Sequence, residues 1–127
     1  MGASGVGPFD NDTAADLAGD IVEGKFSFEQ IEPQFEDESY LEADGGESVL
    51  ALVEIIVASR EGRELPVSGD FSSFVAELSP ERIAWIRHQA NRAVSSAEHS
   101  ELFDLWADAG ELDEWLLPAR EAIGKLA

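Results

Sequence analysis

The chain has 127 residues, enough for one domain with one core and too few for two domains of ordinary size. It carries 27 acidic and 8 basic residues, for a net charge of -19, and it has no cysteine. This composition excludes disulfides and thiolate chemistry, and its negative field repels nucleic acids and anionic membranes while attracting basic proteins or cations.

The start of the chain lacks the basic region and apolar stretch of a signal peptide. The longest apolar run, residues 49–58, is interrupted by Glu54 and is far shorter than the roughly 20 residues that span a bilayer. Apolar residues make up 44% of the chain, which is enough to form a core. We therefore expect a cytoplasmic protein folded as a single acidic helical domain over residues 1–127.

Residues 10–23 are predicted to form the first helix, with Asp10, Asn11 or Asp12 as its cap and Gly24 after its end. One side of this helix is apolar, with Ala14, Leu17, Ala18 and Ile21. The opposite side carries a row of carboxylates, here called the acidic ridge, made of Asp12, Asp16, Asp20 and Glu23. Like charges four residues apart destabilise a helix, so this ridge needs salt, arginines from elsewhere in the fold, or a basic partner.

The segment 25–40 gives mixed signals. Ser27 and Gln30 have the spacing of a capping box, and apolar residues recur at helical spacing. Pro33 lies where the interior of such a helix would be, so any helix in this segment is short or broken.

The most apolar segment predicts a central helix over residues 47–60, with a reciprocal capping pattern in residues 44–47 and Gly62 after its end. Its predicted buried face holds Val49, Leu52, Val53 and Ile56. A second acidic row, Glu47, Glu54 and Glu61, lies opposite. We therefore expect Glu54 to be exposed to solvent, although it interrupts an apolar run as a buried catalytic acid would.

Four further helices are predicted over residues 70–78, 80–96 and 101–109 and from about residue 113 onward. Ser79 and Ser100 have the positions of caps, and Pro118 fits only near the first turn of the last helix. No stretch alternates in polarity as a strand would. The predicted fold class is all-α, a single compact domain of five to six helices around the central helix near residues 47–60.

The opening residues, Met1 to Asp12, read MGASGVGPFDND and resemble the N-terminal signature of the domain-of-unknown-function 4259 family of bacterial proteins. The segments 40–43 and 100–102, and Leu105-Trp106, are similar to further parts of the family pattern. Ser4 and Leu17 stand where family members usually have tryptophan. The resemblance implies no activity. From the residues themselves, we expect the glycines and Pro8 to shape a tight turn.

No catalytic or cofactor motif is present. Asp10 and Asp12 are candidate metal ligands, but they match just the first two positions of a calcium loop, so we expect no metal site. The same carboxylates disfavour a phosphate site at this glycine-rich turn. His88 and His99 lack the spacing of a metal pair, and we expect His88 to be exposed.

Arg82, Arg87 and Arg92 point in different directions around one predicted helix, so they form no basic stripe and are expected to pair with acids of the same chain. Trp85 lies at the edge of that helix's apolar face and is the best candidate for an interface anchor. Trp106 and Trp115 are expected in the core.

The favoured hypothesis is a non-enzymatic acidic interaction module. It would bind a basic protein as immunity proteins and nucleic-acid mimics do, because residues 1–64 alone carry 16 acids and 3 bases. The predicted partner-binding residues are Asp12, Asp16, Asp20, Glu23 and Trp85. Two alternatives stay open: a small enzyme or divalent-metal fold using the Asp10–Asp12 turn, and a salt-adapted scaffold without a specific partner.

Overall fold

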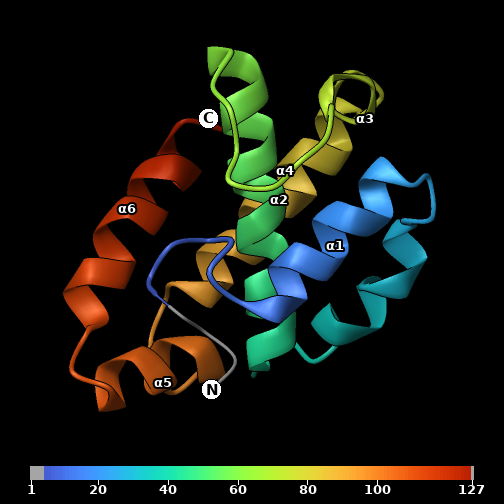
Figure 1. The fold of residues 1–127 in the computed structure, drawn as a ribbon. Helices are drawn as coiled ribbons and strands as arrows, with labels where there is room; N and C mark the ends of the chain where they lie inside the picture. Colours follow the sequence, from blue (N-terminus) through green and yellow to red (C-terminus); the bar gives the residue numbers. More distant parts are fainter. Residues whose placement is uncertain (1–4, 127) are drawn as a thin grey trace.

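The computed structural model describes residues 5–126, which form six α-helices and two short 3-10 helices (Figure 1). In chain order these are α1 (Asp12–Val22), η1 (Phe28–Gln30), η2 (Glu32–Phe35), α2 (Ala43–Glu61), α3 (Ser72–Ala76), α4 (Pro80–Ala93), α5 (Glu101–Asp108) and α6 (Leu112–Gly124). The all-α prediction is confirmed. No helix within residues 5–126 is long and apolar enough to cross a membrane.

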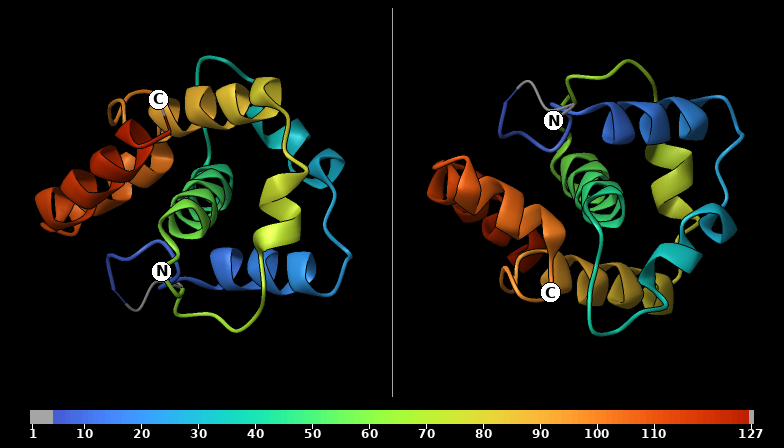
Figure 2. Two further views of the ribbon diagram at one scale, coloured as in Figure 1. Left: turned by 90° about the horizontal axis from the view of Figure 1, so that it is seen from above. Right: turned by 90° about the horizontal axis from the view of Figure 1, so that it is seen from below.

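Helix α2 is the central element. Seen end-on in Figure 2, it is enclosed by α1 on one side, α4 on the opposite side, and α5 with α6 on a third. Its side chains are buried around nearly its whole circumference, including Leu50, Ile55 and Val57, which lie outside the predicted face. The central helix is confirmed, but its polar side is much narrower than the sequence pattern indicated.

The start of α2 differs from the prediction. It begins at Ala43 rather than near Glu47, and Gly45 and Gly46 lie buried inside its first turns instead of preceding it. A methyl group on Gly45 would lie 2.8 Å from Leu41 Cδ1, so the glycine permits a close approach of the chain. The cap comes from elsewhere, because Glu101 Oε1 accepts a hydrogen bond from the Ala43 N–H at 2.8 Å.

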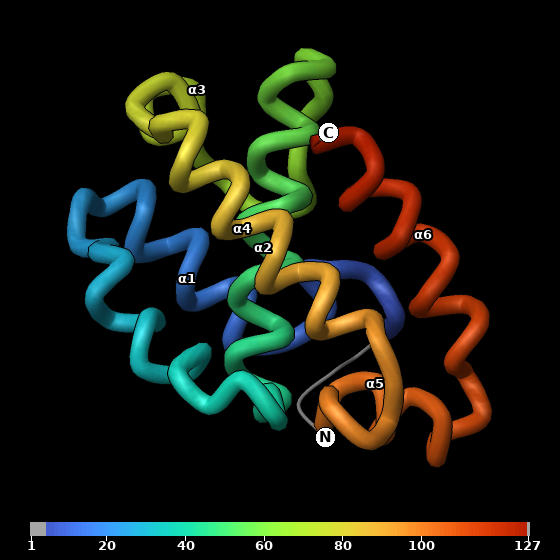
Figure 3. Tube along the Cα trace, turned by 180° about the vertical axis from the view of Figure 1, so that it is seen from behind, coloured from blue at the N-terminus to red at the C-terminus, as the bar shows by residue number. Residues whose placement is uncertain are grey.

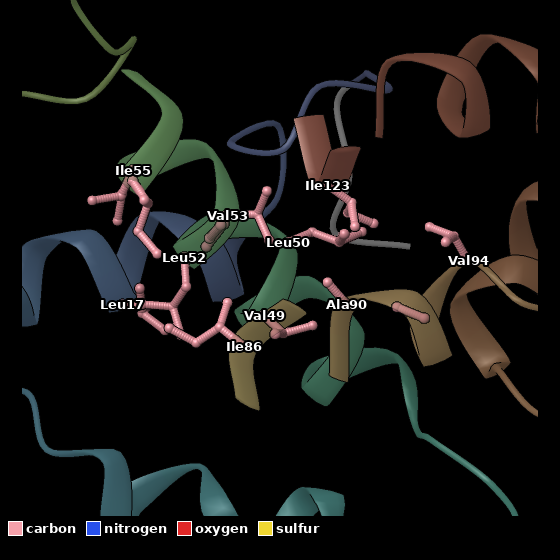
Figure 4. Close-up of a cluster of buried hydrophobic side chains, with 14 of the residues drawn as sticks. Leu17, Val49, Leu50, Leu52, Val53, Ile55, Ile86, Ala90, Val94 and Ile123 are labelled. Carbon is pink, nitrogen blue, oxygen red and sulfur yellow. The ribbon is translucent and has the colours of Figure 1, made fainter. Parts of the chain in front are cut away.

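The buried side chains around α2 come from every surrounding helix. Figure 4 shows Leu52 of α2 in one cluster with Leu17 of α1 and Ile86 of α4. Ala90 of α4 and Ile123 of α6 pack in the same core. This single continuous core holds the other helices in place around α2.

The segment after α1 is held against α4 rather than folding as one helix. As the position of Pro33 predicted, it divides into η1 and η2, with Pro33 in the first turn of η2. Arg92 of α4 donates hydrogen bonds to the carbonyl oxygens of Phe35, at 3.1 Å, and Asp37. These contacts fix a segment that has little regular structure of its own.

The C-terminal helices follow the predicted order, with two differences. Helix α4 ends at Ala93 instead of near residue 96, and Ala97 lies exposed in the turn that follows. Pro118 lies in the middle of α6, not in its first turn. Its ring is on the exposed side of the helix, where water can satisfy the carbonyl oxygen that proline leaves unpaired.

Candidate protein-interaction face

The acidic ridge occupies the outward side of α1. Asn11 caps this helix by accepting a hydrogen bond from the Ala14 N–H at 2.8 Å. Ala14, Leu17 and Ala18 are buried against α2, whereas Asp12, Asp16 and Glu23 are exposed and Asp20 is partly exposed. The amphipathic pattern therefore places the four carboxylates together on one surface.

Little positive charge approaches the acidic ridge. Within the described part of the chain, no ion pair reaches Asp12, Asp16 or Asp20. Glu23 pairs with Lys25 at 3.3 Å, but both side chains are well exposed to water, so this pair contributes little. The ridge thus keeps the mutual repulsion of its carboxylates.

The arginines that could have compensated the ridge are used elsewhere. Arg82 pairs with Glu32 at 2.9 Å and lies over the Phe28 ring, 4.2 Å from its centre, and Arg92 donates to the carbonyl oxygens of Phe35 and Asp37. Arg120 of α6 donates to the carbonyl oxygen of Val94 at 3.0 Å. The expectation that Arg82, Arg87 and Arg92 pair with acids holds for Arg82. Arg92 instead donates to backbone carbonyl oxygens, and Arg87 forms no ion pair within the described residues.

A second group of carboxylates continues the negative surface beyond α1. The segment 25–40 follows α1 around one side of the molecule (Figures 1 and 3). Its exposed acids are Glu29, Glu36, Asp37 and Glu38, and Glu42 and Asp44 follow. Hydrogen bonds from the Ser39 hydroxyl and N–H lower the pKa of the Asp37 carboxyl, which keeps it ionised. Together with the ridge, these residues form a negative surface that extends from α1 around one side of the molecule toward α4, here called the acidic face.

Glu47 is the most unusual carboxylate of this region. It is partly buried on α2, where Thr13 of α1 donates a hydrogen bond to it. Burial raises the pKa of the Glu47 carboxyl, and the charges of Asp44 and Asp12 raise it further, whereas the Thr13 bond acts in the opposite direction. The starts of α1 and α2 therefore bring three acids close enough for their charges to interact.

We expect Glu47→Gln to stabilise the protein at neutral pH. A carboxyl whose pKa is raised by folding binds its proton more tightly in the native state than in the unfolded state. It therefore stabilises the native state at low pH, and this contribution is lost as the pH rises through the raised pKa. The amide cannot ionise but can still accept the bond from Thr13. Urea unfolding should therefore show a more stable variant at pH 7 and no gain near pH 4. A variant less stable than the wild type at pH 7 would contradict this assignment.

The glycine-rich loop before α1 is built around Asp10. Asp10 Oδ2 accepts a hydrogen bond from the Gly7 N–H at 2.9 Å. A methyl group on Gly5 or Gly7 would lie 2.7 or 2.8 Å from the same oxygen, so glycine at these positions leaves room for the Asp10 carboxylate. Asp10 thus closes the loop, while Asp12 faces Glu47 closely enough to affect its pKa. Within residues 5–126, no group of three His, Asp or Glu side chains could hold a metal ion.

A family model described as "Domain of unknown function (DUF4259)" matches residues 2–117. The chain belongs to this family. None of the curated proteins and none of the solved structures compared with the chain matches it.

Two motif segments of this DUF4259 protein, 40–43 and 100–102, meet in space. Leu41 and Ser100 form a parallel bridge, in which the Leu41 N–H donates to the carbonyl oxygen of His99 at 2.8 Å and the Glu101 N–H donates to that of Leu41 at 2.9 Å. Glu101 also caps α2. These motif residues therefore join α2 to α5 and have a structural role. Leu17, at one usual tryptophan position, is buried, and Ser4 lies outside the described residues.

Trp85 lies in an aromatic cluster. Its ring is partly buried and packs edge-on against two phenylalanine rings, with 5.1 Å between the ring centres for Phe35 and 6.2 Å for Phe28. The Arg82 guanidinium carbon lies 5.1 Å from the centre of the Trp85 ring. The structure thus gives this predicted interface anchor a packing role between α4 and the segment 25–40, separate from the acidic ridge. Trp106 and Trp115 are buried, as expected, and the structure stacks their rings on each other.

The histidines do not form a site. His88 is exposed on α4, as predicted, and His99 lies in the turn before α5 with its Nδ1 3.0 Å from the carbonyl oxygen of Ser39.

Glu54, expected to be exposed to solvent in the second acidic row, is mostly covered, and its carboxylate accepts a hydrogen bond from Arg63 at 2.7 Å. Arg63 also pairs with Glu61 at 3.2 Å, and Lys125 pairs with Glu61 at 3.0 Å, so Glu54 and Glu61 of the second acidic row both have basic partners.

One feature of the surface has no signal in the sequence. An apolar hollow of about 80 Å³ lies between the loop before α1, α2 and α6, and a smaller hollow of about 20 Å³ adjoins it. They are formed by residues far apart in the chain, including Pro8, Leu50 and Trp115, which line both. The packing of the loop before α1, α5 and α6 around α2 creates them.

Proposed function

We propose that this DUF4259 protein is a non-enzymatic interaction module of the bacterial cytoplasm, which binds a basic protein through its acidic face. The observation that supports this proposal is the acidic ridge of α1, which has no compensating ion pair at Asp12, Asp16 or Asp20 within the described residues. A row of exposed like charges costs stability, and a partner's lysines or arginines would remove that cost.

The distribution of basic residues supports the same conclusion. The chain has only 8 lysines and arginines, and Arg82, Arg92 and Arg120 are committed to internal contacts away from α1. The negative field of the acidic face is therefore left to act on molecules that approach it. Such a field speeds association with a positively charged protein and repels nucleic acid and anionic lipid.

The test compares two variants with the same change in charge. The triple variant Asp12→Asn/Asp16→Asn/Asp20→Asn neutralises the acidic ridge, and Asp108→Asn/Asp113→Asn/Glu114→Gln neutralises three exposed acids of α5 and α6. Each protein is immobilised, exposed to lysate of the source organism at low salt and eluted with a salt gradient. We expect a basic protein to be retained by the wild type and by the α5–α6 variant, to elute as salt screens the charges, and to be lost from the ridge variant.

Other outcomes would contradict the proposal. Equal retention by both variants would show that the charge acts without a defined face. Retention that is unchanged by salt would rule out steering by exposed carboxylates. Empty elutions, combined with stability that rises steeply with salt, would favour the salt-adapted scaffold. A calorimetric signal with Mg²⁺ or Ca²⁺ that disappears in Asp12→Ala would favour the metal-dependent alternative.

A further inference from the structure

The two hollows beside the loop before α1 form one continuous groove, here called the N-terminal groove. Its shared walls are Gly7, Pro8, Leu50 and Trp115. The larger hollow extends along α6 and reaches Glu54, and the smaller one reaches Glu47. The groove thus has apolar walls and a carboxylate toward each end. In Figure 1 the loop before α1 lies between α6 and α1, in front of α2, so the groove lies next to the start of α1.

The size of the groove selects its occupant. The larger hollow, at about 80 Å³, equals two to three water molecules at roughly 30 Å³ each. Sites for small organic ligands hold about 300–1,000 Å³, so the groove is too small for such a ligand and has room for a single side chain.

The chemistry of the groove matches a long basic side chain. Lysine and arginine have an apolar methylene stem that packs on hydrophobic walls and a charged head that needs an anion. Leu50 and Trp115 supply the walls, and the Trp115 ring can also attract a cation. No ion pair within residues 5–126 neutralises Glu47. At the other end, Glu54 already binds the Arg63 guanidinium at 2.7 Å.

We propose that the N-terminal groove receives the side chain of one lysine or arginine of the basic partner, with its stem against Leu50 and Trp115 and its head at Glu47. This inference rests on the proposed function, and it adds an anchoring point beside the acidic ridge. Electrostatic attraction by the ridge would bring the partner to this side of the molecule, and the groove would fix its register.

The test uses hexalysine as a defined probe, titrated into the full chain at low salt. Ala122→Leu adds bulk to the groove wall without changing the charge, and Ala84→Leu adds the same bulk at an exposed position of α4. We expect Ala122→Leu to weaken hexalysine binding about fivefold or more, as loss of an anchor residue does, and Ala84→Leu to leave it unchanged. Glu47→Gln should weaken binding more than Glu81→Gln, which removes an equal charge from exposed α4.

A second measurement needs no variant. On titration with hexalysine, the indole N–H resonances of Trp106 and Trp115, which line the groove, should shift, and that of Trp85 should not. Unchanged Trp106 and Trp115 resonances, or wild-type affinity in Ala122→Leu, would overturn the groove proposal. If the ridge variant still lost binding in that case, the proposed function would stand. Absence of salt-sensitive hexalysine binding in the wild type would overturn both.

Discussion

Replacing Leu52 with alanine is expected to lower the free energy of unfolding by about 3 kcal/mol, within the range of about 2–5 kcal/mol for buried leucines. Leu52 has no exposed surface and lies where α2 meets α1 and α4. Alanine would leave a cavity among side chains from three helices, and α2 cannot move to fill it because it is enclosed on several sides.

Urea unfolding followed by circular dichroism measures this loss. The control is Leu117→Ala on α6, where the side chain is 65% exposed, and we expect a change within about 0.5 kcal/mol. Similar losses in the two variants would contradict the central position of α2. The loss in Leu52→Ala should also be the same at low and high salt, because the removed contacts carry no charge.

Replacing Ser100 with alanine is expected to lower the free energy of unfolding by about 2–3 kcal/mol, because two hydrogen bonds are lost at a fully buried position. The Ser100 hydroxyl donates to the carbonyl oxygen of Ala93 at 2.7 Å and accepts from the Phe103 N–H at 3.2 Å. The substitution therefore removes the cap of α5 and leaves the Ala93 carbonyl without its partner.

The matched control is Ser79→Ala, which removes the cap of α4. Ser79 is exposed and accepts one hydrogen bond, from the Arg82 N–H at 3.0 Å, so water can replace it and the expected loss is about 1 kcal/mol. Equal losses in the two variants would show that burial of Ser100 adds nothing. The comparison thus isolates the cost of an unsatisfied buried carbonyl from the cost of a missing cap.

The separation of core and charge bears on function. The core and the contacts of the arginines hold α4, α6 and the segment 25–40 in place, while the acidic ridge of α1 takes no part in them. Carboxylates can therefore be neutralised on α1 without unpacking the core. For this reason, a loss of binding in the ridge variant can be distinguished from a loss of folding.

Local signals were sufficient for several elements. The Ser79 cap, a cap of α1 within residues 10–12 and the apolar stripe of α1 were predicted because a cap or a helical face depends on residues within a few positions of each other. The acidic ridge followed for the same reason, since residues four apart share a helical face. The interruption at Pro33 was also predicted, because proline acts on its own turn.

The sequence by itself determined the all-α class, the central helix and the exposed row of carboxylates on α1, because periodicity and capping are local properties. Tertiary structure alone decided the early start of α2, which needs the Glu101 cap from 58 residues away, and the close approach of Leu41 to Gly45. It also decided where the arginines bind and where the N-terminal groove opens. These features depend on distances between segments far apart in the chain, and no local pattern encodes such distances.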